Sequence, residues 1–259
     1  MAWGARTIGA TDRIDLASAI PSISGGNPRT IACWVNPTVV TTVAGPTMFS
    51  YGGNTAGITL VFFIGQTANG DFAVGWTTGN THSTTTPFII NTWQHACLTY
   101  AGGANNTTNI ALYYNGVSQA ASSSGAPTIN TTSNAPGIGY QTAASGGPGA
   151  QLQGNLADVA VWNVVLTAIE VAALAKGIRP PQIRSASLQG YWPLNGLQSP
   201  EPDLSGNKNN GTLTGTTAVA GPPYAPFTPR WPQPLMAAAP TFNPAWALGK
   251  NIVIEGVAT

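Results

Sequence analysis

The chain has 259 residues, of which 43% are hydrophobic and only 7% are charged, and its formal net charge is +1. This composition excludes an intrinsically disordered chain, and about 200–250 residues is an ordinary size for a single all-β sandwich or barrel. The basic residues form no run, which disfavours nucleic-acid binding, and no apolar run approaches the roughly 18 residues of a membrane span.

Short runs of β-branched and aromatic residues recur between clusters of Gly, Asn, Pro and Ser, a pattern that predicts a sandwich or barrel of short strands. In chain order, the predicted strands are 29–37, 47–53, 57–66, 71–78, 93–102, 109–117, 135–140 and 156–164. In the first of them, Ile31, Cys33 and Val35 alternate with Ala32, Trp34 and Asn36. Each strand therefore has two differently used faces.

Two local signals are specific. Asn115 and Gly116 favour a two-residue hairpin turn, because both central residues of that turn need positive φ. Thr167 as N-cap with Glu170 three residues later predicts a capping box at the start of a helix, and Gly177 is expected to end that helix. The sequence therefore predicts one hairpin and one short helix.

Cys33 and Cys97 both lie inside apolar strand patterns, which favours two buried reduced thiols over a disulfide. The spacing leaves open whether they meet. With two Cys, two distant His and no carboxylate cluster, a zinc site is disfavoured.

Pro becomes frequent after the predicted helix, and residues 221–246 lack too many amide donors to form a central strand or a helix. We expect an extended arm there, followed by a terminal strand at 251–257. Five aromatic residues are spaced along the arm as candidate anchors for a partner: Tyr224, Phe227, Trp231, Phe242 and Trp246.

Several motifs together resemble the laminin-G-like, concanavalin A-like jelly-roll family over roughly residues 5–215. They are RTIACWVNP, WQHACLTYAG, IALYYNGV and GNLADVAVWNVVLTAIEVAALAKG. The resemblance implies an all-β, two-sheet antiparallel jelly-roll sandwich with one short helix. We expect this sandwich to span residues 1–221 and the arm to span 222–259.

The segment from Leu188 to Thr214 comes late for this family. In members that it resembles, a segment like GYWPLNG…DLSGNKNNGTLTG precedes the strand that here reads TIGATDRIDLAS. The order therefore looks circularly permuted, with residues 188–214 completing the sandwich. Permutation is inexpensive where the termini lie close together at the surface.

Catalytic chemistry is poorly supported. Glycoside hydrolysis uses two flanking carboxylates, and no predicted strand carries a suitable pair among the eight acidic residues. His82 and His95 belong to no recognisable nucleophile arrangement. For His95 a structural hydrogen-bonding role is favoured, and we expect no enzyme activity.

Ligand-binding candidates are few, and each has a structural alternative. Asp203, Ser205, Asn207 and Asn209 offer oxygen ligands, and the resemblance implies calcium in some members, yet one carboxylate makes a poor site and a structural turn is favoured. Trp76, Asn80 and His82 are the best local glycan-binding candidates. A tryptophan is more often part of a core or of a subunit contact. We therefore predict no required cofactor.

The low charge, the compact domain and the aromatic arm lead to one main functional prediction: a nonenzymatic virion protein, a capsid decoration or fibre subunit of a bacteriophage. The N-terminus shows no basic region followed by an apolar stretch, so a classical signal peptide is not expected. Expected partners are further copies of the chain, as in a trimer, and capsid or other virion proteins, with cell-surface glycans as an additional class. The alternative is a lectin-like carbohydrate-binding module, and a glycoside hydrolase ranks third.

Overall fold

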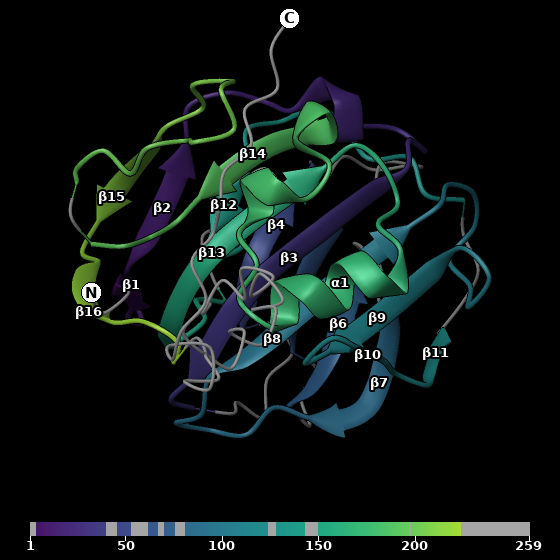
Figure 1. The fold of residues 1–259 in the computed structure, drawn as a ribbon, viewed down its shortest axis with the longest axis horizontal. Coiled ribbons are helices and arrows are strands. Elements are labelled where there is room, and N and C mark those ends of the chain that lie inside the picture. The colour runs from purple at the N-terminus through teal and green to yellow at the C-terminus, as the bar shows by residue number, and fades with distance from the viewer. Residues whose placement is uncertain are drawn as a thin grey trace, which may run out of the picture. The chain divides into compact units, whose positions relative to one another are not determined.

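Two antiparallel β-sheets build the fold in a computed structural model of the chain (Figure 1). The structure describes residues 4–39, 46–52, 62–66, 70–75, 81–123, 128–142, 150–196 and 198–223. The predicted all-β sandwich of the concanavalin A type is thereby confirmed. Among these residues, no helix has the length and apolar character needed to cross a membrane.

The first sheet has the strand order β10-β9-β8-β3-β13-β1-β16, and β14 also pairs with β13. Its strands are β1 (Gly4–Ile8), β3 (Arg29–Pro37), β8 (Gln94–Tyr100), β9 (Ile110–Tyr114), β10 (Val117–Ser118), β13 (Gly154–Trp162), β14 (Leu188–Trp192) and β16 (Thr217–Ala220).

The second sheet has the order β11-β7-β6-β5-β4-β12-β2-β15. Its strands are β2 (Arg13–Leu16), β4 (Thr47–Tyr51), β5 (Phe62–Gln66), β6 (Asp71–Gly75), β7 (Thr81–Pro87), β11 (Ala121–Ser123), β12 (Gly137–Ile138) and β15 (Gly211–Thr214).

The main core contains buried side chains from both sheets, among them Ile31, Leu98 and Val161 from the first and Ile14 and Phe49 from the second. A second cluster includes Cys97, Trp162 and Tyr191 of the first sheet together with Val171 and Leu174 of the helix. The first sheet is therefore covered on both faces, with helix α1 (Ala168–Ala175) packed near β8 and β10 (Figure 1).

Helix α1 begins as predicted. The Glu170 amide donates to Thr167 Oγ1 at 3.3 Å, and the Thr167 amide donates to Glu170 Oε2 at 2.7 Å. This reciprocal pair satisfies two amides that the first helical turn leaves without partners. Gly177 follows the helix with φ of 91°. The described residues also form three short 3₁₀ helices: η1 (Pro21–Ile23), η3 (Pro180–Gln182) and η4 (Ser185–Ser187).

The predicted hairpin is also confirmed. Asn115 and Gly116 have φ of 50° and 80° between β9 and β10, where Tyr114 pairs with Val117. A Cβ on Gly116 would lie 2.9 Å from Ala172 Cα of helix α1. Glycine therefore serves both the turn and the close approach of the helix.

Both cysteines are free and buried, as predicted. In the pairing of β3 with β8, Cys33 lies opposite Ala96 and Cys97 lies opposite Ala32. Cys33 belongs to the main core, where its Sγ is 3.6 Å from Met48 Sδ, and Cys97 belongs to the second cluster. The two thiols therefore face opposite sides of one sheet.

The C-terminal segment contributes to both sheets, since β14 pairs with β13 and β15 pairs with β2. Figure 1 shows β15 beside β2 at one edge of the fold. Trp192 is buried in the main core with its ring centroid 6.5 Å from that of Phe49, and Tyr191 is buried in the second cluster. Residues 188–214 are thus integral to the sandwich, whereas the predicted arm after Pro223 lies outside the described residues.

One detail differs from expectation. The stretch TIGATDRIDLAS, treated above as one strand, is divided between β1 and β2, which belong to different sheets. The Asp12 amide donates to Gly9 O, and Asp12 Oδ2 accepts from the Gly9 amide at 2.8 Å. This turn carries the chain from one sheet to the other.

Candidate functional site

Asp203 organises the loop between β14 and β15. Its Oδ1 accepts from the amides of Tyr191 at 3.0 Å and Ser205 at 2.9 Å, and its Oδ2 accepts from the Asn209 amide at 3.0 Å. The side chain is buried. These bonds from one carboxylate hold three separated amides in place, which agrees with the turn interpretation of this predicted calcium candidate.

Asn209 links this loop by hydrogen bonds to a part of the chain that is far away in sequence. Its Oδ1 accepts from the Ser18 amide and its Nδ2 donates to Ser18 O, both at 2.8 Å. The Asn209 carbonyl accepts from Trp192 Nε1 at 2.8 Å. Asn209 is therefore a clamp that fixes the main chain of Ser18, 191 residues away in sequence, against the core.

A cavity of about 370 Å³, which we call the loop pocket, opens beside this clamp. Its wall consists of Ser18, Ala19, Ile20, Pro21, Ser22, Gln189, Asn207 and Asn209. The wall contains hydroxyl, amide and apolar groups, and in the described part of the chain no charged and no aromatic side chain belongs to it. Its volume falls at the small end of the range of about 300–1,000 Å³ that is usual for small-molecule sites.

The polar groups of the loop pocket are oriented by their neighbours. Ser22 Oγ donates to Gln189 Oε1 at 2.7 Å, and Asn207 Nδ2 donates to Gln189 O at 3.0 Å. Because Asn207 turns its amide nitrogen toward the main chain, its Oδ1 is left to accept. Neither Asn207 Oδ1 nor Ser18 Oγ has a hydrogen bond to any residue that the structure describes. Both residues are exposed.

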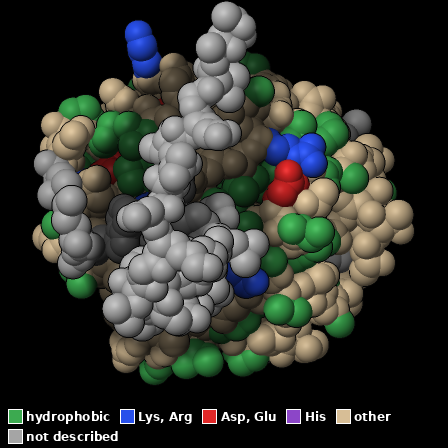
Figure 2. Space-filling view, viewed as in Figure 1, with side chains coloured by type: hydrophobic (Ala, Val, Ile, Leu, Met, Phe, Trp, Pro, Cys, Tyr) green, Lys and Arg blue, Asp and Glu red, His purple; other side chains and the backbone are tan. Residues whose placement is uncertain are grey.

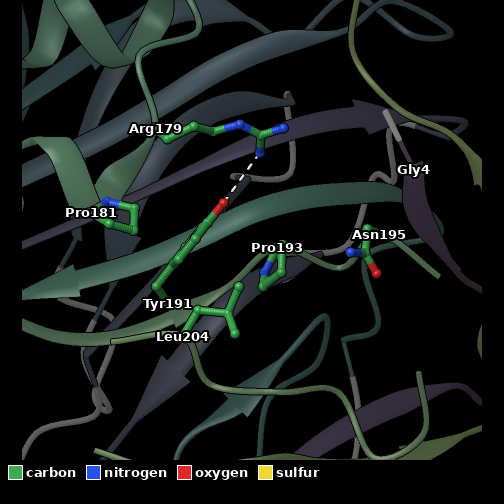
Figure 3. Close-up of a pocket in the computed structure, with 7 residues that line it drawn as sticks. All are labelled: Gly4, Arg179, Pro181, Tyr191, Pro193, Asn195 and Leu204. Carbon is green, nitrogen blue, oxygen red and sulfur yellow. Dashed lines mark hydrogen bonds between the residues drawn. The ribbon is translucent and has the colours of Figure 1, made fainter. Parts of the chain in front are cut away.

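A second cavity of about 300 Å³, the arginine pocket, lies at the other end of β14 (Figure 3). It is lined by Gly4, Arg179, Pro181, Tyr191, Pro193, Asn195 and Leu204. The Tyr191 hydroxyl points toward the Arg179 guanidinium, at 3.2 Å from Nη1, with Pro193 and Leu204 beside the ring (Figure 3).

Asp158 contacts two residues of the arginine pocket, Tyr191 and Arg179, and neutralises the positive charge of Arg179. Its Oδ1 accepts from the Tyr191 hydroxyl at 2.7 Å and from Arg179 Nη1. Asp158 has φ of 49° within β13, at the point where the register with β3 shifts. Burial, followed by the nearby Asp158 charge, raises the pKa of Tyr191. The positive charge of Arg179 is therefore paired with the negative charge of Asp158.

A second buried ion pair ties the same segment to the first strand. Arg6 Nε lies 2.7 Å from Glu201 Oε2, with 5% and 0% of the two side chains exposed. Arg6 Nη2 also donates to Gln198 O. Burial raises the pKa of Glu201, and the Arg6 charge partly opposes this shift.

The predicted glycan-binding group falls largely outside the described residues. Trp76 and Asn80 lie outside the described residues, and His82 is described only as a position of β7 that pairs with Val74 and Ser123. The five aromatic arm residues also lie outside the described residues: Tyr224, Phe227, Trp231, Phe242 and Trp246.

His95 differs from its predicted hydrogen-bonding role. Its main chain pairs with Asn115, but its imidazole Nδ1 is buried without a partner in the described part of the chain. The ring packs edge-on against Trp34 with centroids 5.4 Å apart. Burial lowers the pKa of His95 to about 3, so the ring is neutral at physiological pH.

The described carboxylates mostly have structural partners, and charged side chains on the face shown in Figure 2 are scattered among polar and apolar ones. Ion pairs join Asp15 to Arg13, Asp158 to Arg179, Glu170 to Arg184 and Glu201 to Arg6. No group of three or more His, Cys, Asp or Glu within the described ranges could hold a metal ion.

The strand order and the motifs agree with a family comparison. The model of the concanavalin A-like lectin/glucanase superfamily matches residues 9–172. The chain belongs to this superfamily. The match ends within helix α1, so β14, β15 and three of the eight residues of the loop-pocket wall lie beyond it.

Solved structures show the same fold. A candidate carbohydrate-binding protein from Bacteroides ovatus aligns with a TM-score of 0.63 and 21% identity over 86% of this chain, which spans only 62% of that protein. The heptameric SAP-like pentraxin of Limulus polyphemus aligns with a TM-score of 0.50 and 18% identity, over 69% of this chain and 85% of the pentraxin. A search of the curated proteins found no match.

Sequence reasoning did not identify Ser18, Ser22 and Gln189, and it considered Asn207 and Asn209 only as turn residues or as calcium ligands. No local pattern distinguishes Ser18 or Gln189, because each acquires its role from a residue far away in sequence. The Asn-rich run 207–210 was the available signal, since amide side chains often organise turns and can also present donors and acceptors to a ligand.

Proposed function

We propose that this protein is a nonenzymatic carbohydrate-binding module and that the loop pocket holds the ligand. The observation that carries the proposal is the uncharged wall of hydroxyl and amide groups in a member of a lectin and glucanase superfamily. Hydroxyl and amide groups can both donate and accept hydrogen bonds, as sugar hydroxyls do. The candidate carbohydrate-binding protein of similar fold supports the proposal.

The fixed frame of the loop pocket favours binding. Asp203 and Asn209 hold the loop and Ser18 in position before a ligand arrives. A preorganised site loses less conformational entropy on binding than a mobile one. The apolar part of the wall, Ala19, Ile20 and Pro21, can contact the less polar faces of a sugar ring.

A glycan array probed with the full chain tests this function, followed by calorimetric titration of the best binders. We expect saturable binding of glycans without release of reducing sugar. Absence of binding to every glycan would contradict the proposal, and release of reducing sugar would show an enzyme instead.

The virion role remains a separate proposal. Its support is the low charge and the aromatic arm in residues 222–259. A chain truncated after Pro222 should melt as the full chain does but no longer assemble or sediment with capsids. Normal assembly of the truncated chain would remove the arm from the proposal.

A further inference from the structure

We infer that the ligand of the loop pocket is an uncharged saccharide end, bound without calcium. This inference rests on the proposed carbohydrate-binding function and narrows it to one ligand class. It depends on three features of the pocket. Some acceptor atoms have no hydrogen bond, no described positive side chain lines the wall, and both carboxylate oxygens of Asp203 already accept hydrogen bonds from the main chain.

The unbonded acceptor atoms of the loop pocket favour a ligand that supplies hydrogen-bond donors. Asn207 Oδ1 has no hydrogen bond to a described residue and can only accept, and Ser22 Oγ keeps its lone pairs after donating to Gln189. The Ser18 hydroxyl, which also has no such bond, can both donate and accept. Sugar hydroxyls supply donors to such groups, whereas a carboxylate offers only acceptors. A site arranged for hydroxyl donors discriminates against a ligand that leaves its polar groups unpaired.

The absence of a counter-charge disfavours an acidic sugar. Among the residues that the structure describes, no Lys, Arg or His lines the pocket, so a bound carboxylate would lose hydration without gaining an ionic partner there. Lys208 stands between Asn207 and Asn209 in the sequence and is exposed, but it does not belong to the wall. It therefore offers a test of whether charge contributes.

We expect binding without calcium because the Asp203 carboxylate already accepts hydrogen bonds from main-chain amides. Both of its carboxylate oxygens accept main-chain hydrogen bonds, and Asn209 uses both side-chain polar atoms on Ser18. Calcium sites require six to eight oxygen ligands, usually with several carboxylates. Here the carboxylate positions the clamp, and the clamp positions Ser18 at the pocket.

The experiment measures binding of the full chain to neutral oligosaccharides and to sialate- and uronate-bearing counterparts, each with calcium and with EDTA. We expect neutral glycans to bind equally in both conditions. Ser18→Ala should weaken this binding by about threefold to tenfold, the effect of one lost hydrogen bond. Ser122→Ala, an exposed serine of β11 at the opposite edge of the second sheet, and Lys208→Ala should leave it unchanged.

The outcomes separate this inference from the function on which it rests. Binding only of acidic glycans, a strict calcium requirement or a large loss in Lys208→Ala would overturn the inference while leaving carbohydrate binding intact. Equal binding by wild type and Ser18→Ala would also overturn it, because the ligand would then lie elsewhere. Failure to bind any glycan would remove the proposed function itself.

Discussion

The arginine pocket and the loop pocket border the same strand, β14, yet they use polar chemistry in opposite ways. In the arginine pocket, Arg179, Asp158 and Tyr191 bond to one another. In the loop pocket, Asn207 and Ser18 present groups with no partner among the described residues. The charged groups of the arginine pocket therefore stabilise the fold, while the neutral groups of the loop pocket are the ones that we propose to contact a ligand.

The largest expected effect concerns the buried ion pair. Arg6→Ala leaves Glu201 buried without its partner and should lower the free energy of unfolding by about 3–5 kcal/mol. Arg13→Ala is the matched control, because the Arg13–Asp15 pair is about two-fifths exposed and should cost about 1 kcal/mol or less. Urea denaturation at pH 7 measures both, and equal losses would refute the structural role of the buried charges.

Asp158→Asn tests the arginine pocket directly. Asparagine tolerates the positive φ at this position but removes the charge that Arg179 contacts, so we expect a loss of about 2–3 kcal/mol of stability. Glycan affinity of the folded variant should not change. A variant with normal stability and lost glycan binding would move the ligand site to the arginine pocket.

His95 is a buried titratable group with no ion pair to any residue that the structure describes. Its pKa of about 3 in the folded state lies below the unfolded value of about 6.5, so on acidification the unfolded chain gains the proton first. Stability is complete above pH 6.5 and falls by about 1.4 kcal/mol per pH unit between pH 6 and 3.

At pH 5 this amounts to a loss of about 2 kcal/mol relative to pH 8. His95→Phe keeps a ring against Trp34 and should flatten this part of the stability profile. Denaturation of both proteins at several pH values measures the slopes. An unchanged slope in the variant would assign the acid sensitivity to other groups.

The smallest effect is expected in the wall of the loop pocket. Ser22→Ala removes a hydrogen bond to Gln189 from a half-buried position and should cost about 1 kcal/mol or less. Glycan affinity should nevertheless fall, since Gln189 loses its orientation. Thermal melting with and without glycan compares the two effects, and the comparison of the pockets fails if stability falls while affinity is retained.

The sequence by itself determined the features that depend on neighbouring residues. The capping box of Thr167 and Glu170 and the positive φ of Asn115 and Gly116 are local preferences, and both appear as predicted. The alternation in β3 placed Cys33 and Trp34 on opposite faces, because side chains alternate along any strand.

Only the tertiary structure decided the pockets. Ser18 meets Asn209 across 191 residues, and Tyr191 meets Asp158 because β14 takes over from β1 as the partner along β13. Such contacts arise from strand order and from a bulge in one strand, and neither leaves a periodic trace in the sequence. For the same reason, a short Asn-rich run could suggest a turn, but only the fold could show that it frames a cavity.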